Sequence, residues 1–243
     1  MKIFVTDTYE QMSRKAANII AAQVQLKPSS NLGLATGGTP VGMYKQLIKM
    51  NEENDINFEN VRTFNLDEYY PIDKNNDQSY YTFMNENLFK HVNINEQNTN
   101  IPNGMADNIE EECKNYDSKI EEAGGVDIQV LGIGHNGHIG FNEPDGIFTK
   151  ETNCVELTET TINANVRFFD SIEDVPKKAL TMGIGTIMKS KKILLLASGE
   201  DKAEIIKIMI EGDIDPKVPA SVLQLHPDVT IVLDKKAAGK LTL

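Results

Sequence analysis

The most regular feature of this chain is an alternation between short apolar runs and longer segments in which apolar residues recur every three or four positions. Short apolar runs are typical of strands that are buried on both faces of a sheet. Six of them are present, at Lys2–Val5, Asn31–Ala35, Val61–Leu66, Asp127–Gly132, Lys192–Ala197 and Val229–Leu233. Strands that alternate with helices favour an α/β fold with a largely parallel sheet and helices on both of its faces.

The helical pattern is clearest in two segments. Apolar residues recur at helical spacing at Met12, Ala16, Ile19, Ile20 and Val24, and again at Ile205, Ile206, Met209 and Ile210. The first segment follows Asp7 and Glu10, which have the spacing of an acidic variant of the capping box. We therefore expect a helix to begin directly after Asp7.

No tandem repeat, Ser/Gly-rich linker or low-complexity tract divides the chain, so residues 1–243 are predicted to form a single domain. The least regular stretch runs from about Asp145 to Val175 and has isolated aromatic residues at Phe148, Phe168 and Phe169. Because long irregular segments inside compact domains are often functional, this stretch is a candidate lid.

Charge and cysteine content narrow the possible partners. A formal net charge of -12 and a sequence pI near 4.8 argue against nucleic acid or an anionic membrane, which both need a cationic face. An anionic small molecule is still allowed if local cations or backbone N–H groups bind it. Cys113 and Cys154 lie far apart and favour neither a disulfide framework nor a thiolate metal site. With no signal-peptide or membrane-span pattern, we expect a soluble cytoplasmic protein.

Ligands of an open parallel sheet bind beyond the carboxyl ends of its strands, which draws attention to four segments. The first is Thr36-Gly37-Gly38-Thr39-Pro40. Its glycines permit close backbone approach, Thr39 can cap a helix, and Pro40 suits the first helical position. Backbone N–H groups there can bind a phosphate, although a tight turn that needs glycine only for its geometry is an alternative.

The second segment, Asn65–Tyr69, places the adjacent carboxylates of Asp67 and Glu68 at the end of an apolar run. If the chain is still extended there, the two side chains point to opposite faces. One of them would then face the ligand as a general base while the other pairs structurally. Capping of a helix by Asp67 is the alternative.

The third segment, Leu131–Pro144, contains two of the four histidines, His135 and His138, among four glycines. An imidazole that titrates near neutrality can both give and take a proton. Glu143 can reach His138 if Gly140 lets the chain turn, and would then orient the ring and favour its protonated form. A third ligand at a recognisable spacing is missing, which makes zinc an unfavoured interpretation.

The two remaining histidines, His91 and His226, lack glycine-rich surroundings and are interpreted as structural.

The fourth set of residues supplies positive charge and consists of Arg167 and Lys202. Taken alone, each would be interpreted as a solvated surface cation. In so acidic a chain, however, they are candidate phosphate ligands.

Together these motifs resemble the glucosamine-6-phosphate deaminases over essentially the whole chain. The resemblance rests on the Thr36–Pro40 segment, Phe64–Tyr69, Ser79–Tyr81, Gly137–Pro144, Arg167–Asp170 and Leu223–Pro227. It implies a Rossmann-like three-layer α/β sandwich that uses no cofactor and no metal. The implied reaction converts an amino-sugar phosphate, glucosamine 6-phosphate, to fructose 6-phosphate and ammonia.

The same resemblance implies roles for individual residues. Asp67 would move a proton between C2 and C1 of the open-chain sugar, and His138 would open the ring with Glu143 as its partner. Thr36, Gly37, Gly38 and Thr39 would hold the phosphate together with Arg167 and Lys202. Some members of the family carry Asp where this chain has Asn136, which leaves more of the stabilisation of an imidazolium to Glu143.

Two alternatives remain open on the sequence. A 6-phosphogluconolactonase has a similar fold and Gly-His segment, but Asn142-Glu143-Pro144 and Leu66–Tyr69 favour the deaminase. A sugar-phosphate-sensing regulatory domain would bind ligand without turnover, and no DNA-binding segment precedes the first strand.

Some deaminases are hexamers activated by an acetylated sugar phosphate. In this chain the corresponding stretch, Asp145–Glu156, offers Lys150 as its only cation, which makes a second phosphate site electrostatically poor. Without an effector site, oligomerisation loses its regulatory reason, so a monomer is preferred.

Overall fold

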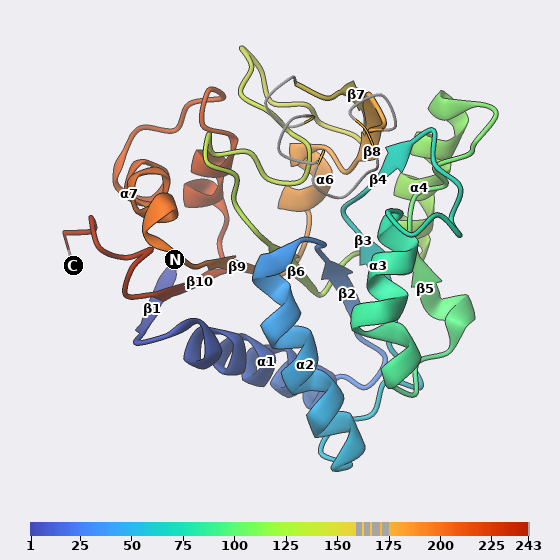
Figure 1. Ribbon diagram of the computed structural model, residues 1–243, viewed down its shortest axis with the longest axis horizontal. Coiled ribbons are helices and arrows are strands. Elements are labelled where there is room, and N and C mark those ends of the chain that lie inside the picture. Colours follow the sequence, from blue (N-terminus) through green and yellow to red (C-terminus); the bar gives the residue numbers. More distant parts are fainter. Residues whose placement is uncertain (159–161, 163–165, 167–170, 172–174, 243) are drawn as a thin grey trace.

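A seven-stranded parallel sheet forms the centre of the molecule in the computed structural model, which describes residues 1–158, 162, 166, 171 and 175–242 (Figure 1). Its order is β1-β10-β9-β6-β2-β3-β5. The strands are β1 (Lys2–Thr6), β2 (Asn31–Leu34), β3 (Arg62–Asn65), β5 (Thr99–Asn100), β6 (Ile128–Leu131), β9 (Ile193–Ala197) and β10 (Val229–Asp234). The six strands predicted from apolar runs are therefore confirmed, and β5 adds a short edge strand.

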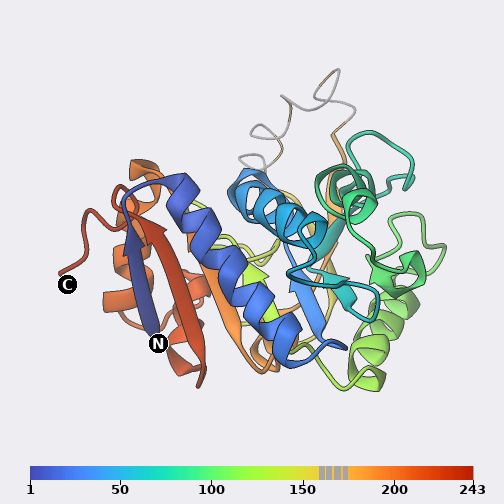
Figure 2. The same ribbon diagram turned by 90° about the horizontal axis from the view of Figure 1, so that it is seen from below.

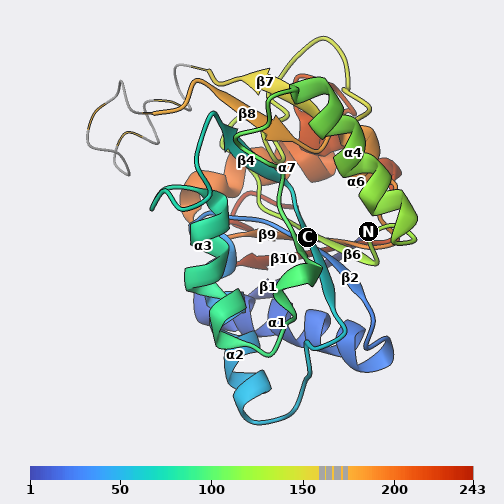
Figure 3. The same ribbon diagram turned by 90° about the vertical axis from the view of Figure 1, so that its right-hand side faces the viewer.

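Helices cover both faces of this sheet, which confirms the predicted three-layer α/β architecture (Figures 1 and 3). On one face lie α1 (Tyr9–Leu26), α2 (Gly38–Glu52) and α3 (Tyr80–Asn87). On the other lie α4 (Ile109–Glu122), α6 (Ile184–Met188), α7 (Ala203–Glu211) and the 3-10 helix η6 (Pro219–Leu225). Shorter 3-10 turns are η1 (Phe89–His91), η2 (Glu96–Asn98) and η5 (Glu200–Lys202).

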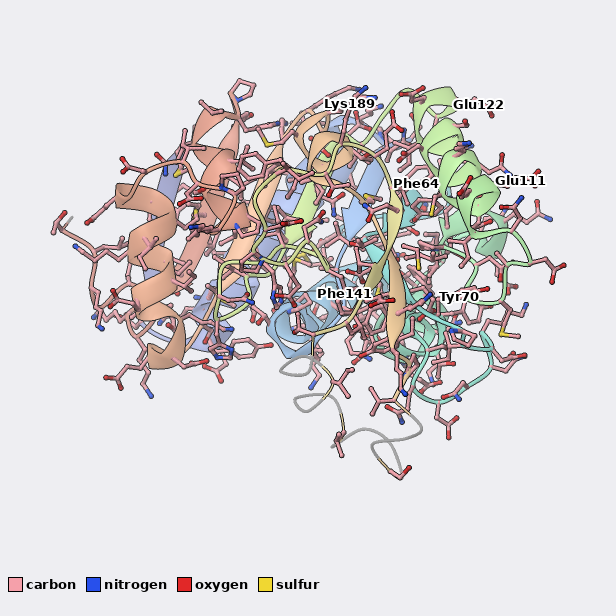
Figure 4. All side chains as sticks on the ribbon, turned by 90° about the horizontal axis from the view of Figure 1, so that it is seen from above. Phe64, Tyr70, Glu111, Glu122, Phe141 and Lys189 are labelled. Atoms are coloured by element: carbon pink, nitrogen blue, oxygen red, sulfur yellow. The ribbon has the colours of Figure 1, made fainter. Side chains whose placement is uncertain are left out.

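The apolar runs in the interior of the sheet form strands because both of their faces are buried. β1 was also predicted to be a buried strand, but it lies at the sheet edge with Phe4 and Val5 exposed, so that part of the prediction is wrong. Every residue of β2, β6 and β9 is buried, and these strands lie in the interior of the sheet between the helical layers. Phe64 of β3 packs edge-on against Tyr116 of α4 with ring centroids 6.3 Å apart, whereas Glu111 and Glu122 lie along the outer side of that helix (Figure 4). The edge strand β1 and both termini lie at the opposite end from α4 (Figure 2).

The start of α1 differs by one residue from the predicted cap. Thr8, not Asp7, is the N-cap residue, and its hydroxyl accepts a hydrogen bond from the backbone N–H of Gln11 at 3.3 Å. The Gln11 side chain in turn accepts from the backbone N–H of Asp7 at 2.9 Å. Asp7 instead forms an exposed ion pair with Lys235 at 2.5 Å. A capping box is present, but its members are a threonine and a glutamine.

A second, antiparallel sheet was not predicted. It consists of β4 (Asp67–Tyr70), β8 (Lys178–Thr181) and β7 (Asn153–Glu156), in the order β4-β8-β7. Strand β7 lies inside the stretch that the sequence analysis expects to be irregular, so that expectation is wrong for these four residues. Only Leu66 separates the carboxyl end of β3 from the start of β4, so Asp67 lies at the ligand-binding edge of the central sheet.

No helix among the residues that the structure describes is both long enough and apolar enough to cross a membrane.

Candidate active site

The predicted strand-end segments meet around one cavity of about 400 Å³. Its walls come from the residues that follow β2, β3, β6 and β9, as expected for the carboxyl edge of a parallel sheet. The lining residues are Ala35, Thr36, Gly37, Thr39, Leu66, Asp67, Tyr80, Gly132, Ile133, Gly134, His135, Asn136, His138, Gly140, Phe141 and Lys202. Segments far apart in the sequence thus contribute to a single site.

The loop after β2 ends in the N-terminus of α2. Gly37, with φ of +91°, is the N-cap residue, and no side chain caps the first turn. The prediction that Thr39 caps this helix with Pro40 at its first position is therefore wrong, because the helix already begins at Gly38. An uncapped first turn at a cavity wall presents backbone N–H groups and the positive end of the helix dipole, which together favour an anion.

The hydroxyl of Tyr9, on α1, fixes the position of this loop. It lies 3.0 Å from the carbonyl oxygen of Gly38 and 3.2 Å from that of Thr39. It also accepts a hydrogen bond from the backbone N–H of Gly42 at 2.8 Å. The first turn of α2 is thereby tied to a second helix on the same face of the sheet.

Asp67 lies in the cavity wall as the first residue of β4, with 6% of its surface exposed. The alternative role as a helix cap is wrong, since the residue begins a strand. Burial raises the pKa of Asp67 to about 8, and the negative charge of Glu68 adds to the effect. A carboxylate with so high a pKa is a strong base for its type.

Glu68 points away from the cavity, as the alternation of side chains along a strand predicts. It is 2% exposed, and its carboxylate accepts hydrogen bonds from the backbone N–H groups of Tyr69, Tyr80 and Tyr81 at 2.9, 2.9 and 3.1 Å. Asp67 thus lines the cavity while Glu68 pairs with backbone groups, as expected for adjacent residues of an extended chain.

His138 and Glu143 lie together, as the spacing predicted, and Asn136 joins them in one cluster. The His138 Nδ1 and Glu143 Oε1 atoms lie 3.4 Å apart, and Asn136 Nδ2 donates to Glu143 Oε2 at 2.5 Å. The Asn136 side-chain oxygen accepts from the backbone N–H of His138 at 3.2 Å. Gly140, with φ of +58°, provides the turn that brings Glu143 back to the histidine. Glu143 itself does not line the cavity.

Gly134 allows the imidazole of His138 to pack against the backbone. A Cβ atom added at this glycine would lie 2.2 to 2.4 Å from three atoms of the ring, which is closer than any real contact. The ring therefore occupies the space that a side chain at position 134 would need.

Lys202 is the lysine among the residues that line the cavity. Burial lowers its pKa, an effect that the neighbouring charge of Asp201 opposes. Asp201 also contacts His135, whose Nε2 atom lies 2.6 Å from Asp201 Oδ2 in an exposed ion pair. The cavity thus combines one lysine and two histidines with the acidic Asp67. Arg167, the other predicted phosphate ligand, lies outside the described residues, as do Phe168 and Phe169 of the candidate lid.

An aromatic wall next to Asp67 was missed by sequence reasoning. Tyr80 stacks on Phe141 with ring planes 1° apart and centroids separated by 6.2 Å, and its centroid lies 4.8 Å from that of Tyr69. Phe141 lies near the centre of the molecule (Figure 4). Thr36, Tyr80 and Phe141 all line the cavity. The available signal was the Ser79–Tyr81 motif, since Ser79 caps the helix that carries Tyr80.

The two histidines interpreted as structural lie away from the cavity. His226 is 4% exposed, contacts the carbonyl oxygen of Ser190 at 2.7 Å through Nε2, and accepts from the backbone N–H of Asp228 at 3.1 Å. His91 contacts the carbonyl oxygen of Glu86 at 3.0 Å. Within the described ranges, no group of three or more His, Cys, Asp or Glu side chains is arranged to hold a metal ion.

Comparisons with known proteins agree with this site. The family model of glucosamine-6-phosphate isomerases/6-phosphogluconolactonase matches residues 5–232. The chain is 61% identical over 241 residues to a glucosamine-6-phosphate deaminase of Clostridioides difficile (strain 630), covering 99% of this chain and 97% of that relative. It is 59% identical over 243 residues, the full length of both chains, to the deaminase of Clostridium botulinum (strain Langeland / NCTC 10281 / Type F).

Solved structures divide into two groups by sequence identity. A monomeric glucosamine-6-phosphate deaminase superposes with a TM-score of 0.96 at 48% identity, covering 99% of this chain and 100% of that chain. A 6-phosphogluconolactonase from Leishmania guyanensis superposes with a TM-score of 0.74 at 19% identity, over 100% and 99% of the two chains, and shares the fold alone. The chain therefore belongs to the family of glucosamine-6-phosphate deaminases.

Proposed function

We propose that this protein converts D-glucosamine 6-phosphate and water to D-fructose 6-phosphate and ammonia, a step of amino-sugar catabolism. The observation that carries the proposal is the place of Asp67. This buried carboxylate, with a pKa raised to about 8, lies in the same cavity as an uncapped helix N-terminus and a lysine. Family membership at 61% identity supports the same reaction.

The phosphate binds at the start of α2. Backbone N–H groups of the Thr36–Thr39 segment surround it, and Lys202 neutralises part of its charge. Arg167 is assigned to the same phosphate by the family motif alone. Binding energy from this remote group orients the open-chain sugar over Asp67.

His138 opens the sugar ring. A proton must leave the anomeric hydroxyl and another must reach the ring oxygen, and a histidine can do both. Glu143 lies 3.4 Å from Nδ1 and holds the orientation of the imidazole, while Asn136 holds Glu143 at 2.5 Å. The amide of Asn136 contributes no charge, so Glu143 alone in this cluster supplies a carboxylate.

Asp67 then carries out the isomerisation. The C2 proton of the open-chain aldehyde is acidic because the resulting carbanion is delocalised into the carbonyl group, and Asp67 removes it. Return of that proton to C1 gives the C2 imine of fructose 6-phosphate. Water adds to C2 and ammonia leaves. The C1 carbonyl is reduced as C2 is oxidised, so the reaction balances without an external redox partner, and we propose that no cofactor and no metal take part.

Product analysis tests the proposal and separates it from its alternatives. Purified protein incubated with glucosamine 6-phosphate is expected to release ammonia and fructose 6-phosphate in equal amounts. A 6-phosphogluconolactonase would instead release acid from 6-phosphogluconolactone, and a sensor domain would bind the amino-sugar phosphate without turnover. Binding of glucosamine 6-phosphate without ammonia release would contradict the proposal.

Assembly, domain structure and compartment belong to the proposal as well. We infer one domain over 1–243, and a monomer like the solved relative described as monomeric. The stretch from about 145 to 175 is proposed as a lid, because residues up to Phe141 line the cavity directly before it. Cys113 and Cys154 are free thiols, which fits a reducing, cytoplasmic compartment.

A further inference from the structure

Glu68 is a buried charged residue to which the reaction gives no direct part. All of its hydrogen-bond partners in the described structure are backbone N–H groups, one from its own strand and two from the first turn of α3. Removing a carboxylate from water destabilises the folded state, and hydrogen bonds offset that desolvation penalty only in part. Its presence beside Asp67 therefore calls for a reason other than stability.

The contacts of Glu68 determine how α3 is attached. The backbone N–H groups of Tyr80 and Tyr81 donate to Glu68, and that of Thr82 donates to the Ser79 hydroxyl at 3.0 Å. All three N–H groups at the start of this helix are thereby satisfied. The carboxylate also lies at the positive end of the helix dipole, which stabilises its charge.

The first residue of α3 is also part of the cavity. The Tyr80 ring stacks on Phe141, and both rings line the cavity together with Thr36 of the proposed phosphate loop. A shift at the start of α3 would move this ring relative to both Thr36 and Asp67. The hydrogen bond from the backbone N–H of Tyr80 to the Glu68 carboxylate therefore connects β4 directly to a residue of the cavity wall.

We propose that Glu68 is a positioning residue: its carboxylate fixes the start of α3 on β4, holds Tyr80 in the cavity wall, and places a negative charge beside Asp67. The inference rests on the function proposed for Asp67. The two adjacent carboxylates then have different roles. Asp67 reacts with the substrate, and Glu68 determines the surroundings of Asp67.

The charge has a definable effect because few groups near Asp67 can ionise. The titratable side chains that interact with Asp67 in the described structure are Glu68 and Tyr69 on its own strand, Tyr80 on α3 and Tyr116 on α4. Burial raises the pKa of Tyr69 to about 12 and those of Tyr80 and Tyr116 further, so these phenols are neutral during catalysis.

Glu68 is therefore the neighbour that is negative when Asp67 titrates. Burial raises the pKa of Glu68 to about 7, against the opposing effect of its three backbone N–H bonds. Asp67, with a pKa of about 8, ionises in the presence of that charge. Removing the charge should make Asp67 easier to ionise and weaker as a base.

Two substitutions separate the effect of the Glu68 charge from the effect of the length of its side chain. Glu68→Gln keeps the length but removes the charge and turns an N–H₂ group toward a backbone donor. Glu68→Asp keeps the charge but shortens the side chain by one methylene, so the bonds to α3 are lost. Glu96→Gln is the matched control, because Glu96 accepts from the Tyr81 hydroxyl at an exposed position outside the cavity.

The measurement is kcat and KM for glucosamine 6-phosphate as functions of pH, together with the melting temperature of each variant. Glu68→Gln is expected to move the acid limb of the kcat profile to lower pH and to lower its maximum about tenfold. Glu68→Asp is expected to keep the acid limb in place while kcat falls and KM rises. The control is expected to match the wild type.

A purely structural role would lower the melting temperature without moving the acid limb, so an unchanged profile in a folded Glu68→Gln variant would overturn the proposal. If Glu68→Gln does not fold, wild-type kcat and KM in a folded Glu68→Asp variant would overturn it instead. A wild-type protein that releases no ammonia would refute the proposed function, whereas active wild type with unaffected Glu68 variants refutes only this inference.

Discussion

At the scale of single residues, the site depends on one carboxylate that folding keeps in an unfavourable environment. In the unfolded chain Asp67 ionises near its ordinary pKa of about 4, whereas in the folded chain its pKa is about 8. Between these two values the folded state binds more protons than the unfolded state. Stability therefore falls as the pH rises from about 4 to about 8. Asp67 thus illustrates a reactive group retained at a cost in stability.

This linkage predicts that Asp67→Asn stabilises the protein, and more so at higher pH. The gain over the wild type should be small near pH 4, grow toward pH 8 and then level off, since an amide carries no charge to be buried. Thermal unfolding of both proteins across this range measures it, with roughly 2–4 °C expected for each kcal/mol. A gain that does not change with pH would contradict the raised pKa.

A second prediction at this scale concerns Gly134. In Gly134→Ala the new Cβ would lie 2.2 Å from the nearest ring atom of His138, so the imidazole must move away from its position beside Glu143. Because a displacement of about 1 Å in a catalytic group can cost on the order of 100-fold, kcat should fall by at least about tenfold.

Gly239→Ala is the control for this test. A Cβ there comes no closer than 3.2 Å to a neighbouring atom, and Gly239 lies outside both the cavity lining and the proposed lid. Equal kcat values for the two alanine variants would show that the packing of His138 on Gly134 does not matter for turnover.

The residues that could be predicted are those whose role follows from local spacing. His138, Asn136 and Glu143 lie within eight positions, so a glycine turn was enough to bring them together. Tyr80 could not be predicted in the same way, because its place in the cavity depends on the contact of α3 with β4. The backbone N–H groups of Tyr80 and Tyr81 donate to Glu68 across 12 and 13 positions, and no local sequence pattern predicts these hydrogen bonds.

At the scale of secondary-structure elements, the proposed phosphate loop depends on how α1 and α2 pack. Removing the Tyr9 hydroxyl in Tyr9→Phe takes away its contacts with Gly38, Thr39 and Gly42 while the ring remains. A lost hydrogen bond is worth about 1 kcal/mol, which corresponds to roughly fivefold in binding. We expect KM for glucosamine 6-phosphate to rise by about that factor with a smaller change in kcat.

Tyr81→Phe provides the matched control for Tyr9→Phe. Its hydroxyl donates to Glu96 at 3.0 Å in an exposed position away from the phosphate loop. KM should stay at the wild-type value in this variant. A Tyr9→Phe enzyme with unchanged KM would mean that α1 does not hold the loop.

The elements that could be predicted are those buried on both faces. β9 consists of apolar residues throughout and β6 does so apart from Gln129, so their sequence alone marks them as interior strands. β4 has the sequence Asp-Glu-Tyr-Tyr, which resembles a polar turn. It becomes a strand only by pairing with β8, in which Thr181 lies opposite Asp67 and 114 positions after it. β7 is half-exposed and lies at the edge of the same sheet, so no continuous apolar run marks it.

At the scale of the whole molecule, the charge distribution argues against a second phosphate site. The segment Asp145–Glu156 has Lys150 as its only cation, and that lysine pairs with Glu151 at 3.6 Å in an exposed position. An effector that binds two states equally cannot shift their equilibrium. We therefore predict hyperbolic saturation by glucosamine 6-phosphate and no response to N-acetylglucosamine 6-phosphate.

Substrate titrations with and without the acetylated sugar test this prediction, with light scattering to give the molar mass in the same buffer. A mass near 27.0 kDa is expected for a monomer. A sigmoidal curve that the acetylated sugar makes hyperbolic would show that an effector site exists.

The most direct test of the mechanism is transfer of hydrogen from C2 of the substrate to C1 of the product, measured by NMR with substrate deuterated at C2 alongside ammonia release. If Asp67 carries the proton between C2 and C1, the wild type places part of that deuterium at C1 of fructose 6-phosphate and releases ammonia. Folded Asp67→Asn should do neither, while calorimetry still detects substrate binding through the phosphate. Deuterium transfer and ammonia release near wild-type rates in Asp67→Asn would contradict the assignment of Asp67 as the base.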